Sequence, residues 1–471
     1  MARLVIVSNR VGSTLKANEG GLATAIQSAV GERDVVWFGW SGEVCEGTPG
    51  ETKYLREGRL IRALVDIEAS DYEGYYVGFS NRVLWPLFHY RPNLADYNRE
   101  DWAAYLRVND FLAERLAAML LPDDVVWIHD YHLIPFAQAL RRRGVRNSLG
   151  FFLHIPFPAS EVMVVLPVHA QLMEALFAYD LVGFQTDKDT RAFYDYVGRE
   201  AGGRISPDRE TGLGVAYAFG SSVRADTFPI SIDTARVATV ADRASRTPHA
   251  KRLRDSLSGR HLAIGIDRLD YTKGLLRRFA AVERLYEDYP IYRRGLVVLQ
   301  IAPPSREDVP EYQQIRADLD ARIGRINGRF GEPDILPVRY LNRHFRQESL
   351  FGFYRSSRIG LVTPLRDGMN LVAKEYVASQ DPEDPGVLVL SRFAGAAAEL
   401  EAALLVNPVD VDQVAEALHR AASMPLDERK ARYKSMMDRL TTHDVHRWFR
   451  TFLGKLQPAD PQISSAQENA A

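Results

Sequence analysis

The sequence predicts an α/β fold with two doubly wound sheets of mainly parallel strands. Short apolar runs recur along the chain, and within each run almost every position is apolar rather than every second one. Such continuous runs are typical of parallel strands that are covered on both faces. Amphipathic stretches such as 99–120 and 273–289 separate many of the runs. This alternation indicates right-handed strand–helix–strand units.

The apolar runs form two series, which predicts two domains in a chain of 471 residues. The first series is RLVIVS (3–8), VVWFGW (35–40), VVWIHD (125–130), LGFFLHI (149–155) and LVGFQT (181–186), and the second is HLAIGI (261–266), LVVLQIA (296–302), RIGLVTP (358–364), GVLVLS (386–391) and ALLVNP (403–408). We therefore expect an N-terminal domain over residues 1–233 and a C-terminal domain over 234–443. Residues 444–456 are predicted to form a helix that returns to the first domain. The polar tail 457–471 is predicted to be disordered.

Composition and charge favour a soluble protein that acts on small molecules. The chain has 59 Lys and Arg against 61 Asp and Glu, which argues against nucleic acid or an anionic membrane as the main partner. Its single cysteine, Cys45, excludes an internal disulfide framework and fits a reducing compartment. The N-terminal apolar run is too short for a signal peptide, and no stretch approaches the roughly 20 apolar residues of a membrane span. We therefore expect a cytoplasmic protein with no membrane partner.

The segment TPLRDGMNLVAKE (363–375) joins a predicted strand to a predicted helix. Gly368 and the first helical N–H groups would present donors and the positive end of the helix to an anion. Asp367, at the carboxyl end of the strand, can accept hydrogen bonds from hydroxyl groups. Glu375 lies about two turns along the helix, roughly 10–12 Å away by helical rise. This distance suits a ligand that extends from a sugar past phosphates to a ribose, although an ordinary turn with two surface acids is the alternative.

Two cations follow another predicted strand, in IDRLDYTKG (266–274). Arg268 can hold a phosphate with two parallel donors, and Lys273 supplies a compact charge. With a helix N-terminus they would form a diphosphate clamp, and a pair of surface cations is the alternative. In the loop after the first strand, Gly20 and Gly21 permit close approach of backbone to phosphate, unless they only make the loop flexible.

Further residues suit a second, anionic sugar ligand. Arg10 follows the first strand, and Arg306 follows a loop that prolines would stiffen, although a solvated arginine is the alternative. Tyr76 and Trp85 can pack on the apolar faces of a sugar. Because clustered aromatic residues are more often core, this signal is weak by itself.

We interpret two metal-like patterns as non-metal features. His129 and His132 flank Asp130 near a strand end, and His154 ends the next strand, but no cysteine or third ligand has a useful spacing. The DxD pattern within ADLDA (317–321) lies in a helical pattern, so we assign it to a helix surface. We expect no metal and no cofactor, because the loops supply cations, acids and aromatic residues rather than a hydride carrier or a nucleophilic triad.

Seven sequence blocks resemble the bacterial trehalose-6-phosphate synthases of glycosyltransferase family 20. The blocks are RLVIVSNR, VWFGWSGE, FSNRVLWPLFHYR, WIHDYHL, GFFLHIPFP, DRLDYTKG and VTPLRDGMNLVAKEYVA, in the order of the family, from residue 3 to about 450. The resemblance implies a GT-B fold, in which two Rossmann-like domains enclose the active site in a cleft. It also implies a retaining glycosyltransferase that moves glucose from a nucleotide-glucose, commonly UDP-glucose, to glucose 6-phosphate. The product would be α,α-trehalose 6-phosphate.

The resemblance also implies roles for individual residues. On the donor side, Arg268 and Lys273 would hold the diphosphate, and Gly20 and Gly21 would close over it. His154 and Asp367 would contact the glucose, and the backbone of Gly368, Met369 and Asn370 would offer hydrogen-bond donors. Leu371 and Val372 would lie near the nucleoside, and Glu375 would bind the ribose. On the acceptor side, Arg10, Tyr76 and Arg306 would bind the phosphate, and Trp40, Trp85 and Asp130 would shape the sugar pocket. His154, Arg268, Lys273 and Asp367 would be the catalytic residues. The leaving diphosphate would help to deprotonate the acceptor, so the protein would act by positioning and charge stabilisation.

Several alternatives stay open at this point. A related glycosyltransferase could use another phosphorylated acceptor such as glycerol 3-phosphate, and a silent sugar-phosphate sensor could share the fold. A dehydrogenase is weaker, because the first loop lacks the dinucleotide fingerprint. The base of the donor and a homo-oligomeric state are also open, and osmoprotection is an expectation at the level of the family. The loop from Arg10 to Gly20 is slightly shorter than the family pattern and lacks its prolines.

Overall fold

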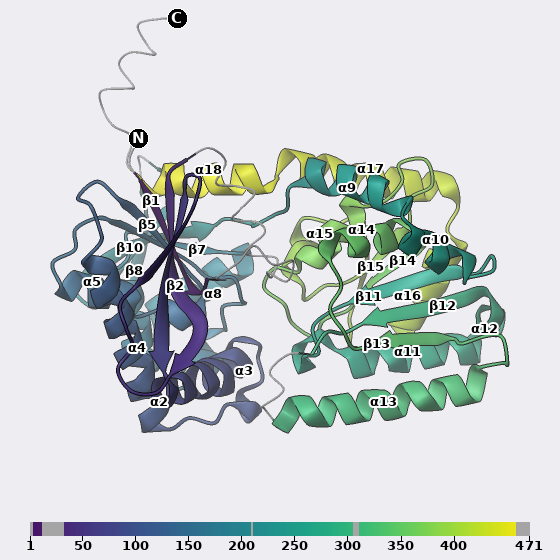
Figure 1. Cartoon of the computed structure of the whole chain (residues 1–471), viewed down its shortest axis with the longest axis horizontal. Coiled ribbons are helices and arrows are strands. Elements are labelled where there is room, and N and C mark those ends of the chain that lie inside the picture. The colour runs from purple at the N-terminus through teal and green to yellow at the C-terminus, as the bar shows by residue number, and fades with distance from the viewer. Residues whose placement is uncertain (1–2, 12–32, 209–210, 305–309, 458–471) are drawn as a thin grey trace, which may run out of the picture. The chain divides into compact units, whose positions relative to one another are not determined.

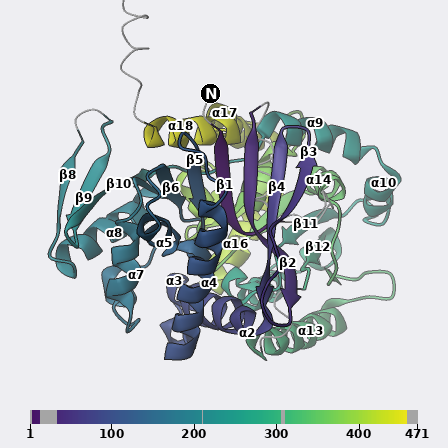
Figure 2. The ribbon, with the colours of Figure 1, turned by 60° about the vertical axis from the view of Figure 1, so that its left-hand side comes forward.

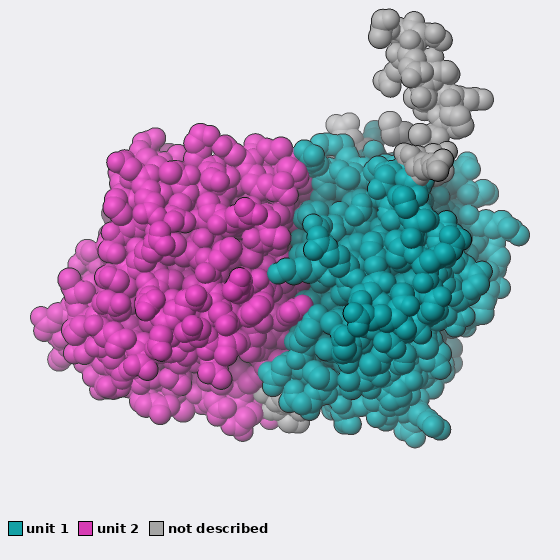
Figure 3. All heavy atoms as spheres, turned by 180° about the vertical axis from the view of Figure 1, so that it is seen from behind, with its two compact units in different colours: residues 1–16, 26–229, 446–471 teal, residues 17–25, 230–445 magenta. Residues whose placement is uncertain are grey.

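The computed structural model describes residues 3–11, 33–208, 211–304 and 310–457 (Figure 1). They belong to two compact units, which Figure 3 shows in teal and magenta. Unit 1 contains the described residues up to 229 and from 446 onward, and unit 2 contains those from 230 to 445. The predicted site residues Gly20, Gly21 and Arg306 lie outside the described residues, and so does the tail from 458.

Unit 1 is built on a sheet whose described strands follow the order β3-β4-β2-β1-β5-β6-β7-β10-β9-β8. Their bounds are β1 Leu4–Arg10, β2 Val35–Cys45, β3 Lys53–Glu57, β4 Leu60–Glu68, β5 Val125–His129, β6 Ser148–Phe152, β7 Leu181–Phe184, β8 Arg204–Pro207, β9 Gly214–Ala218 and β10 Ser221–Thr227. The central strands are parallel, since Leu4 pairs with Val35 on one side and with Val125 on the other. Antiparallel strands complete both edges, among them the hairpin β8–β9 (Figure 2).

The helices of unit 1 include an unusual π-helical segment. They are α2 Ala69–Tyr72, α3 Trp85–Phe88, α4 Arg99–Ala117, α5 Phe136–Arg142, α6 Ser160–Met163, α7 His169–Leu176, α8 Asp187–Arg199 and α18 Val445–Leu456, with 3₁₀ turns at Pro92–Leu94 and Tyr131–Leu133. The π-helix η1 spans Glu73–Leu84, and the N–H of Trp85 closes its end on the carbonyl of Ser80. Such segments are rare in proteins, and those that occur are often found at functional sites.

The last helix, α18, packs on the sheet of unit 1. The ring of Trp448 lies 4.7 Å from that of Trp127 on β5, and the ring of Phe452 stacks on Trp127 at 4.5 Å. At the end of the helix, Arg224 donates to the carbonyls of Lys455 and Leu456 at 2.8 and 3.3 Å. A cation at the carbonyl end of a helix satisfies free acceptors and the helix dipole, so this contact fixes the end of α18.

Unit 2 contains a second sheet, whose described strands are parallel in the order β13-β12-β11-β14-β15-β16. Their bounds are β11 His261–Ile266, β12 Leu296–Ile301, β13 Val338–Leu341, β14 Ile359–Val362, β15 Val387–Ser391 and β16 Leu404–Val406. The helices are α9 Thr234–Ser245, α10 Pro248–Asp255, α11 Leu275–Asp288, α12 Tyr292–Gly295, α13 Pro310–Phe330, α14 Gln347–Arg355, α15 Leu371–Ala378, α16 Val411–Ser423 and α17 Leu426–Thr442, with 3₁₀ turns at Tyr271–Lys273 and Gly395–Ala398. Side chains of α11, α13 and α16 share a buried cluster with strand residues such as Val298 and Leu361.

The apolar runs of the sequence correspond to strands of both sheets, and the strands that the runs missed have a physical reason. β3 is exposed along its whole length, and β10 begins with two exposed residues and then alternates buried and half-buried positions. Neither carries the continuous apolar run that predicts a strand covered on both faces. The DxD pattern of 318–320 lies within α13, as predicted.

Candidate active site

Two loops of unit 2 are tied together at the carboxyl ends of β11 and β14. The backbone N–H groups of Leu365 and Arg366 both donate to the carbonyl of Thr272, at 2.7 and 3.4 Å. Gly274 has a φ of +67°, and a Cβ there would lie 2.8 Å from the carbonyl oxygen of Thr363. Any other residue at this position would therefore be strained and would push the two loops apart.

Lys273 and Asp367 form an ion pair between these loops. Nζ of Lys273 donates to Oδ2 of Asp367 at 2.6 Å. Asp367 also accepts from the side-chain amide of Asn370 at 3.1 Å and from the backbone N–H of Met369 at 3.2 Å. Arg268 is exposed in the loop that carries Lys273. The structure thus brings the predicted clamp lysine and the predicted sugar-binding acid into direct contact.

Helix α15 begins two residues later than the sequence pattern suggested. Asn370 has a left-handed φ of +62° and caps the helix, since its Oδ1 accepts from the N–H of Ala373 at 3.1 Å. Met369 therefore lies before the helix. In the first turn of α15, the N–H of Ala373 is bonded to the side chain of the cap, Asn370. Gly368 is buried in the turn, Leu371 is buried, and Val372 is half-buried at the start of the helix.

Glu375 lies on α15 in an environment that disfavours its charge. Nε2 of Gln347, the first residue of α14, donates to Oε1 of Glu375 at 3.3 Å. Burial raises the pKa of Glu375 to about 7, although Gln347 and the nearby charge of Arg236 act in the opposite direction. Near neutral pH this carboxyl group therefore exchanges between an acceptor-only form and a form that also donates.

In unit 1, Arg10 ends β1 and lies over Trp40 of β2. The guanidinium carbon is 5.7 Å from the centre of the Trp40 ring, and the indole N–H of Trp40 donates to the carbonyl of Glu43 at 2.7 Å. Gly42 has a φ of +93°, and a Cβ there would lie 2.6 Å from Nε of Arg10. The absence of a side chain at Gly42 gives the guanidinium its place.

Tyr76, on the π-helix η1, belongs to an aromatic stack with Trp40. The Tyr76 ring is 5.5 Å from Tyr72, 5.7 Å from Trp40 and 5.8 Å from His132, and it is nearly parallel to His132 at 10°. Trp85 directly follows η1, is 5% exposed and packs against His89 at 4.2 Å. Tyr76 is half-buried beside Arg10's neighbour Trp40, whereas Trp85 is part of the core.

Asp130 and His154 follow the neighbouring strands β5 and β6 and contact each other. Asp130 has a left-handed φ of +76°, and its Oδ1 accepts from the backbone N–H of His154 at 3.2 Å. Nδ1 of His129 lies 3.0 Å from Nε2 of His154. Burial lowers the pKa of His129 to about 3, and burial together with His129 holds the pKa of His154 well below its usual value. Both rings are therefore neutral at physiological pH.

Sequence reasoning missed four residues that support these groups. His132 and Gly42 place Tyr76 and Arg10, Gln347 contacts Glu375, and Arg278 is buried behind the loops of unit 2. In the sequence, His132 fits only a metal-like pattern with His129. Its stacking on Tyr76 leaves no local pattern in the sequence. The other three act on residues far away in the sequence.

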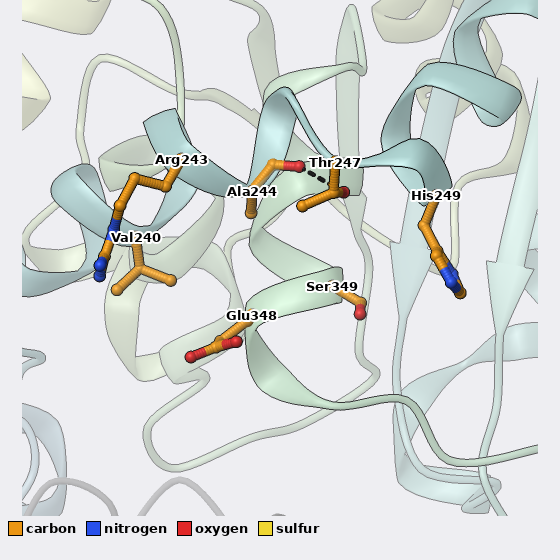
Figure 4. A pocket seen from close by; sticks show the side chains of 7 residues that line it. All are labelled: Val240, Arg243, Ala244, Thr247, His249, Glu348 and Ser349. Atoms are coloured by element: carbon orange, nitrogen blue, oxygen red, sulfur yellow. Dashed lines mark hydrogen bonds between the residues drawn. The ribbon is translucent and has the colours of Figure 1, made fainter.

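A cavity of about 260 Å³ in unit 2 contains none of the predicted site residues. It lies between α9, α10 and α14 and is lined by Val240, Arg243, Ala244, Thr247, His249, Glu348 and Ser349 (Figure 4). Figure 4 shows Arg243 and His249 at opposite sides of this group, so their side chains do not converge on one point. We assign no ligand to this cavity.

Comparison with known proteins identifies the family. A family model described as glycosyltransferase family 20 matches residues 4–458. The chain belongs to glycosyltransferase family 20. This family 20 enzyme is 49% identical over 467 residues to the trehalose-6-phosphate synthase of Sinorhizobium fredii, covering 97% of this chain and 98% of that relative. The trehalose-6-phosphate synthase of Klebsiella pneumoniae is 48% identical over 469 residues, covering 99% and 98%.

Solved structures share the fold of this family 20 enzyme. The UDP-forming α,α-trehalose-phosphate synthase of Burkholderia xenovorans, in complex with glucose-6-phosphate, has a TM-score of 0.94 and 49% identity over 97% of this chain and 100% of that chain. A structure from E. coli bound with UDP-2-fluoro glucose has a TM-score of 0.90 and 45% identity over 97% and 99%. The expected GT-B fold and glycosyltransferase class are confirmed, and a dehydrogenase is excluded.

Proposed function

We propose that this family 20 enzyme moves glucose from UDP-glucose to glucose 6-phosphate with retention of configuration. The products are α,α-trehalose 6-phosphate and UDP. The observation that carries the proposal is the joined pair of loops in unit 2, where Lys273 pairs with Asp367 and Arg268 is exposed in the same loop as Lys273. Relatives that match nearly the whole chain are named for this reaction, and one solved relative contains glucose-6-phosphate.

On the donor side, we assign the diphosphate to the cations of the β11 loop. Arg268 and Lys273 provide the positive charge, and Asp367 accepts from hydroxyl groups of the glucose. The Lys273 contact holds the Asp367 carboxylate in one orientation before the donor binds. Because groups fixed in advance need no reorganisation when charge develops on the leaving diphosphate, this arrangement lowers the barrier. Glu375 is assigned to the ribose. The turn that contains residues Met369 to Val372 is assigned to contacts with the nucleotide.

On the acceptor side, we assign the 6-phosphate to Arg10 and Tyr76, and the sugar ring to the neighbouring aromatic and acidic groups. Trp40 lies beside both Arg10 and Tyr76, and Asp130 lies beside His154. An arginine is suited to a phosphate because its donors form a planar fork. Arg306 and the glycines at 20 and 21 keep their predicted roles as proposals. Trp85 is 5% exposed, so only a small part of its side chain is available to the sugar.

The proposed reaction needs no protein nucleophile. The 1-hydroxyl oxygen of glucose 6-phosphate forms a bond to C1 of the donor glucose while the bond from C1 to the diphosphate oxygen breaks. The hydroxyl proton passes to the leaving diphosphate on the same face of the sugar. His154 is buried and neutral, so we assign it to hydrogen bonding with the transferred glucose rather than to proton transfer.

Some features of the proposal concern the environment of the enzyme. Among the residues that the structure describes, none of the helices combines the length and apolar character needed to cross a bilayer. We propose a cytoplasmic enzyme that has a part in osmoprotection and that requires no metal or cofactor.

An assay of substrate combinations tests the proposal. The purified enzyme is incubated with UDP-, GDP- or ADP-glucose and with glucose 6-phosphate or glycerol 3-phosphate, and the products are identified by NMR. We expect α,α-trehalose 6-phosphate and UDP from UDP-glucose and glucose 6-phosphate. A product from glycerol 3-phosphate alone would replace the acceptor assignment, and no transfer with any pair would favour the sugar-phosphate sensor.

A further inference from the structure

Arg278 is a buried cation whose side chain contacts the ends of three strands of unit 2. It belongs to α11 and is 1% exposed. Its Nε donates to Oγ1 of Thr363 at 2.9 Å, and its Nη1 donates to Oε1 of Gln300 at 2.8 Å. Nη1 also forms a hydrogen-bonded ion pair with the carboxylate of Asp267. One guanidinium thus joins three buried polar side chains.

The three partners of Arg278 are arranged along one edge of the sheet. Asp267 directly follows β11, Gln300 is next to the last residue of β12, and Thr363 directly follows β14. These strands are neighbours in the order β12-β11-β14. In an open parallel sheet, this carboxyl edge is where ligands bind. Arg278 therefore fixes the edge from behind, without needing to reach a ligand.

The backbone of β11 leaves room for this arrangement. A Cβ on Gly265 would lie 2.5 Å from Oε1 of Gln300 and 2.7 Å from Nη1 of Arg278. The close packing means that the guanidinium cannot shift toward β11. Burial of a charged pair is costly, and apolar groups of similar volume often replace such a pair without loss of stability. Stability by itself therefore does not explain a buried arginine here.

The contacts lead directly to the groups that we assign to the donor. Asp267 is the neighbour of Arg268 in the chain, and Thr363 begins the loop that carries Asp367. Thr363 also approaches Gly274, the residue after Lys273, through its carbonyl oxygen. Arg278 thus fixes the start of one loop relative to the start of the other. The distance between Lys273 and Asp367 depends on both.

We propose that Arg278 is a positioning residue for the donor diphosphate site. It holds the β11 loop, with Arg268 and Lys273, at a fixed spacing from the β14 loop, with Asp367. The inference rests on the proposed function, because it assigns these loops to the donor. Misplacement of binding groups by about 1 Å can cost roughly a hundredfold in rate, so a residue that sets the spacing has a functional effect without touching the substrate.

The sharpest test changes Thr363 rather than Arg278, whose replacement can prevent folding. Thr363→Val keeps the shape and removes the acceptor for Nε of Arg278, whereas Thr363→Ser keeps a hydroxyl. Thr234→Val is a matched control, because Thr234 is also a buried threonine of unit 2 and loses one hydrogen bond, to the carbonyl of Leu440 at 3.0 Å. Calorimetry measures the Kd for UDP and for glucose 6-phosphate, and thermal unfolding measures Tm.

We expect Thr363→Val to weaken UDP binding by roughly tenfold, because loss of the hydrogen bond to Arg278 loosens the spacing between the two loops and misplaces the groups assigned to the diphosphate. Thr363→Ser and Thr234→Val should stay within about twofold of the wild type on that scale, and glucose 6-phosphate binding should be unchanged in all three. If Thr363→Val and Thr234→Val lower Tm alike and neither changes UDP binding, Arg278 is only structural and the inference is wrong. Because UDP binding is measured directly, this result is distinct from a failure of the wild type to make the disaccharide.

Discussion

Lys273 and Asp367 are 94 positions apart in the chain, and their side chains meet at 2.6 Å between the loops that follow β11 and β14. Both side chains are largely shielded, with 13% and 11% of their surfaces exposed. Their attraction is therefore less screened than that of a surface pair. In the proposed function, this contact orders the carboxylate assigned to the sugar hydroxyls and positions the cation assigned to the leaving diphosphate.

Removing the Lys273 charge should damage catalysis much more than folding. Lys273→Ala should lower kcat/KM with UDP-glucose, and the drop should correspond to a loss of about 3–4 kcal/mol in transition-state stabilisation. Arg268→Ala should act in the same direction. Lys434→Ala is the matched control, since Lys434 contacts Asp438 at 2.6 Å on an exposed helix face. Unchanged turnover in the Lys273 variant would remove that residue from the diphosphate clamp.

The pKa of Glu375, raised to about 7, predicts a pH dependence of donor binding. A ribose hydroxyl donates best to the ionised carboxylate, so the affinity for UDP-glucose should rise as pH increases from 5.5 to 7.5. We expect a change on the order of tenfold, because the ionised fraction grows over this range. UDP-glucose has no phosphate monoester that titrates there. The curve should be flat in Glu375→Gln, and a wild-type slope that persists in this variant would assign the titration to another group.

The same carboxyl group should affect stability with the opposite dependence on pH. The folded-state pKa of Glu375 exceeds the value of 4.5 for an unperturbed glutamate, so the folded protein binds the extra proton between pH 4.5 and about 7. Its contribution to the free energy of unfolding falls as pH rises through this window. Glu375→Gln should therefore gain about 2 kcal/mol relative to wild type between pH 5 and pH 8, measured by urea unfolding.

Gly42 should be needed for acceptor binding because it gives room to Arg10. Gly42→Ala should raise the KM for glucose 6-phosphate by roughly tenfold, as loss of a charge-assisted hydrogen bond predicts, and leave the KM for UDP-glucose unchanged. Gly47→Ala is the control, since Gly47 has a similar positive φ of +73° and nothing within 4 Å of its Cβ position. Equal effects of the two variants would attribute the loss to backbone strain.

His129 should orient His154 and also make the protein sensitive to acid. His129→Phe keeps the ring between Trp127 and Trp448 but removes the contact with Nε2 of His154, so kcat should fall about fivefold. The pKa of His129 is lowered to about 3, so the wild type should lose stability as pH falls below about 6.5, where the unfolded chain binds the proton.

Acid unfolding of the two forms measures this second effect. The loss for His129 can reach about 1.4 kcal/mol per pH unit between its two pKa values, and the variant should show a shallower slope. His249→Phe, at an exposed histidine, serves as control. Identical slopes in all three proteins would show that His129 does not carry the acid sensitivity.

Chelation should leave turnover unchanged. The proposed diphosphate clamp uses Arg268 and Lys273 as the source of positive charge, which is the task that a divalent cation has in many enzymes of phosphate chemistry. Dialysis against EDTA, followed by assays with and without added Mg²⁺ or Mn²⁺, measures this directly. A loss that is restored by one metal would require an ion site in addition to the clamp.

The sequence by itself determined the two series of buried parallel strands and the positions of the polar loops. Continuous apolar runs report burial on both faces, and that property is local, so β1, β5, β11 and β14 could be predicted without a structure. The placement of Asp130, Lys273 and Asp367 after such strands followed from the same pattern. The exposed strand β3 and the π-helix η1 could not be predicted, because neither has the periodicity of its neighbours.

Only the tertiary structure decided which of these residues touch. The pairing of Lys273 with Asp367 depends on the adjacency of β11 and β14, which are separated in the chain by two other strands. In the same way, the charge of Arg278 looks like one more helix surface cation until the sheet order places it behind three strand ends. Burial is written in the local pattern of apolar residues, whereas contacts between distant side chains depend on strand order and loop conformation, which no short stretch of sequence contains.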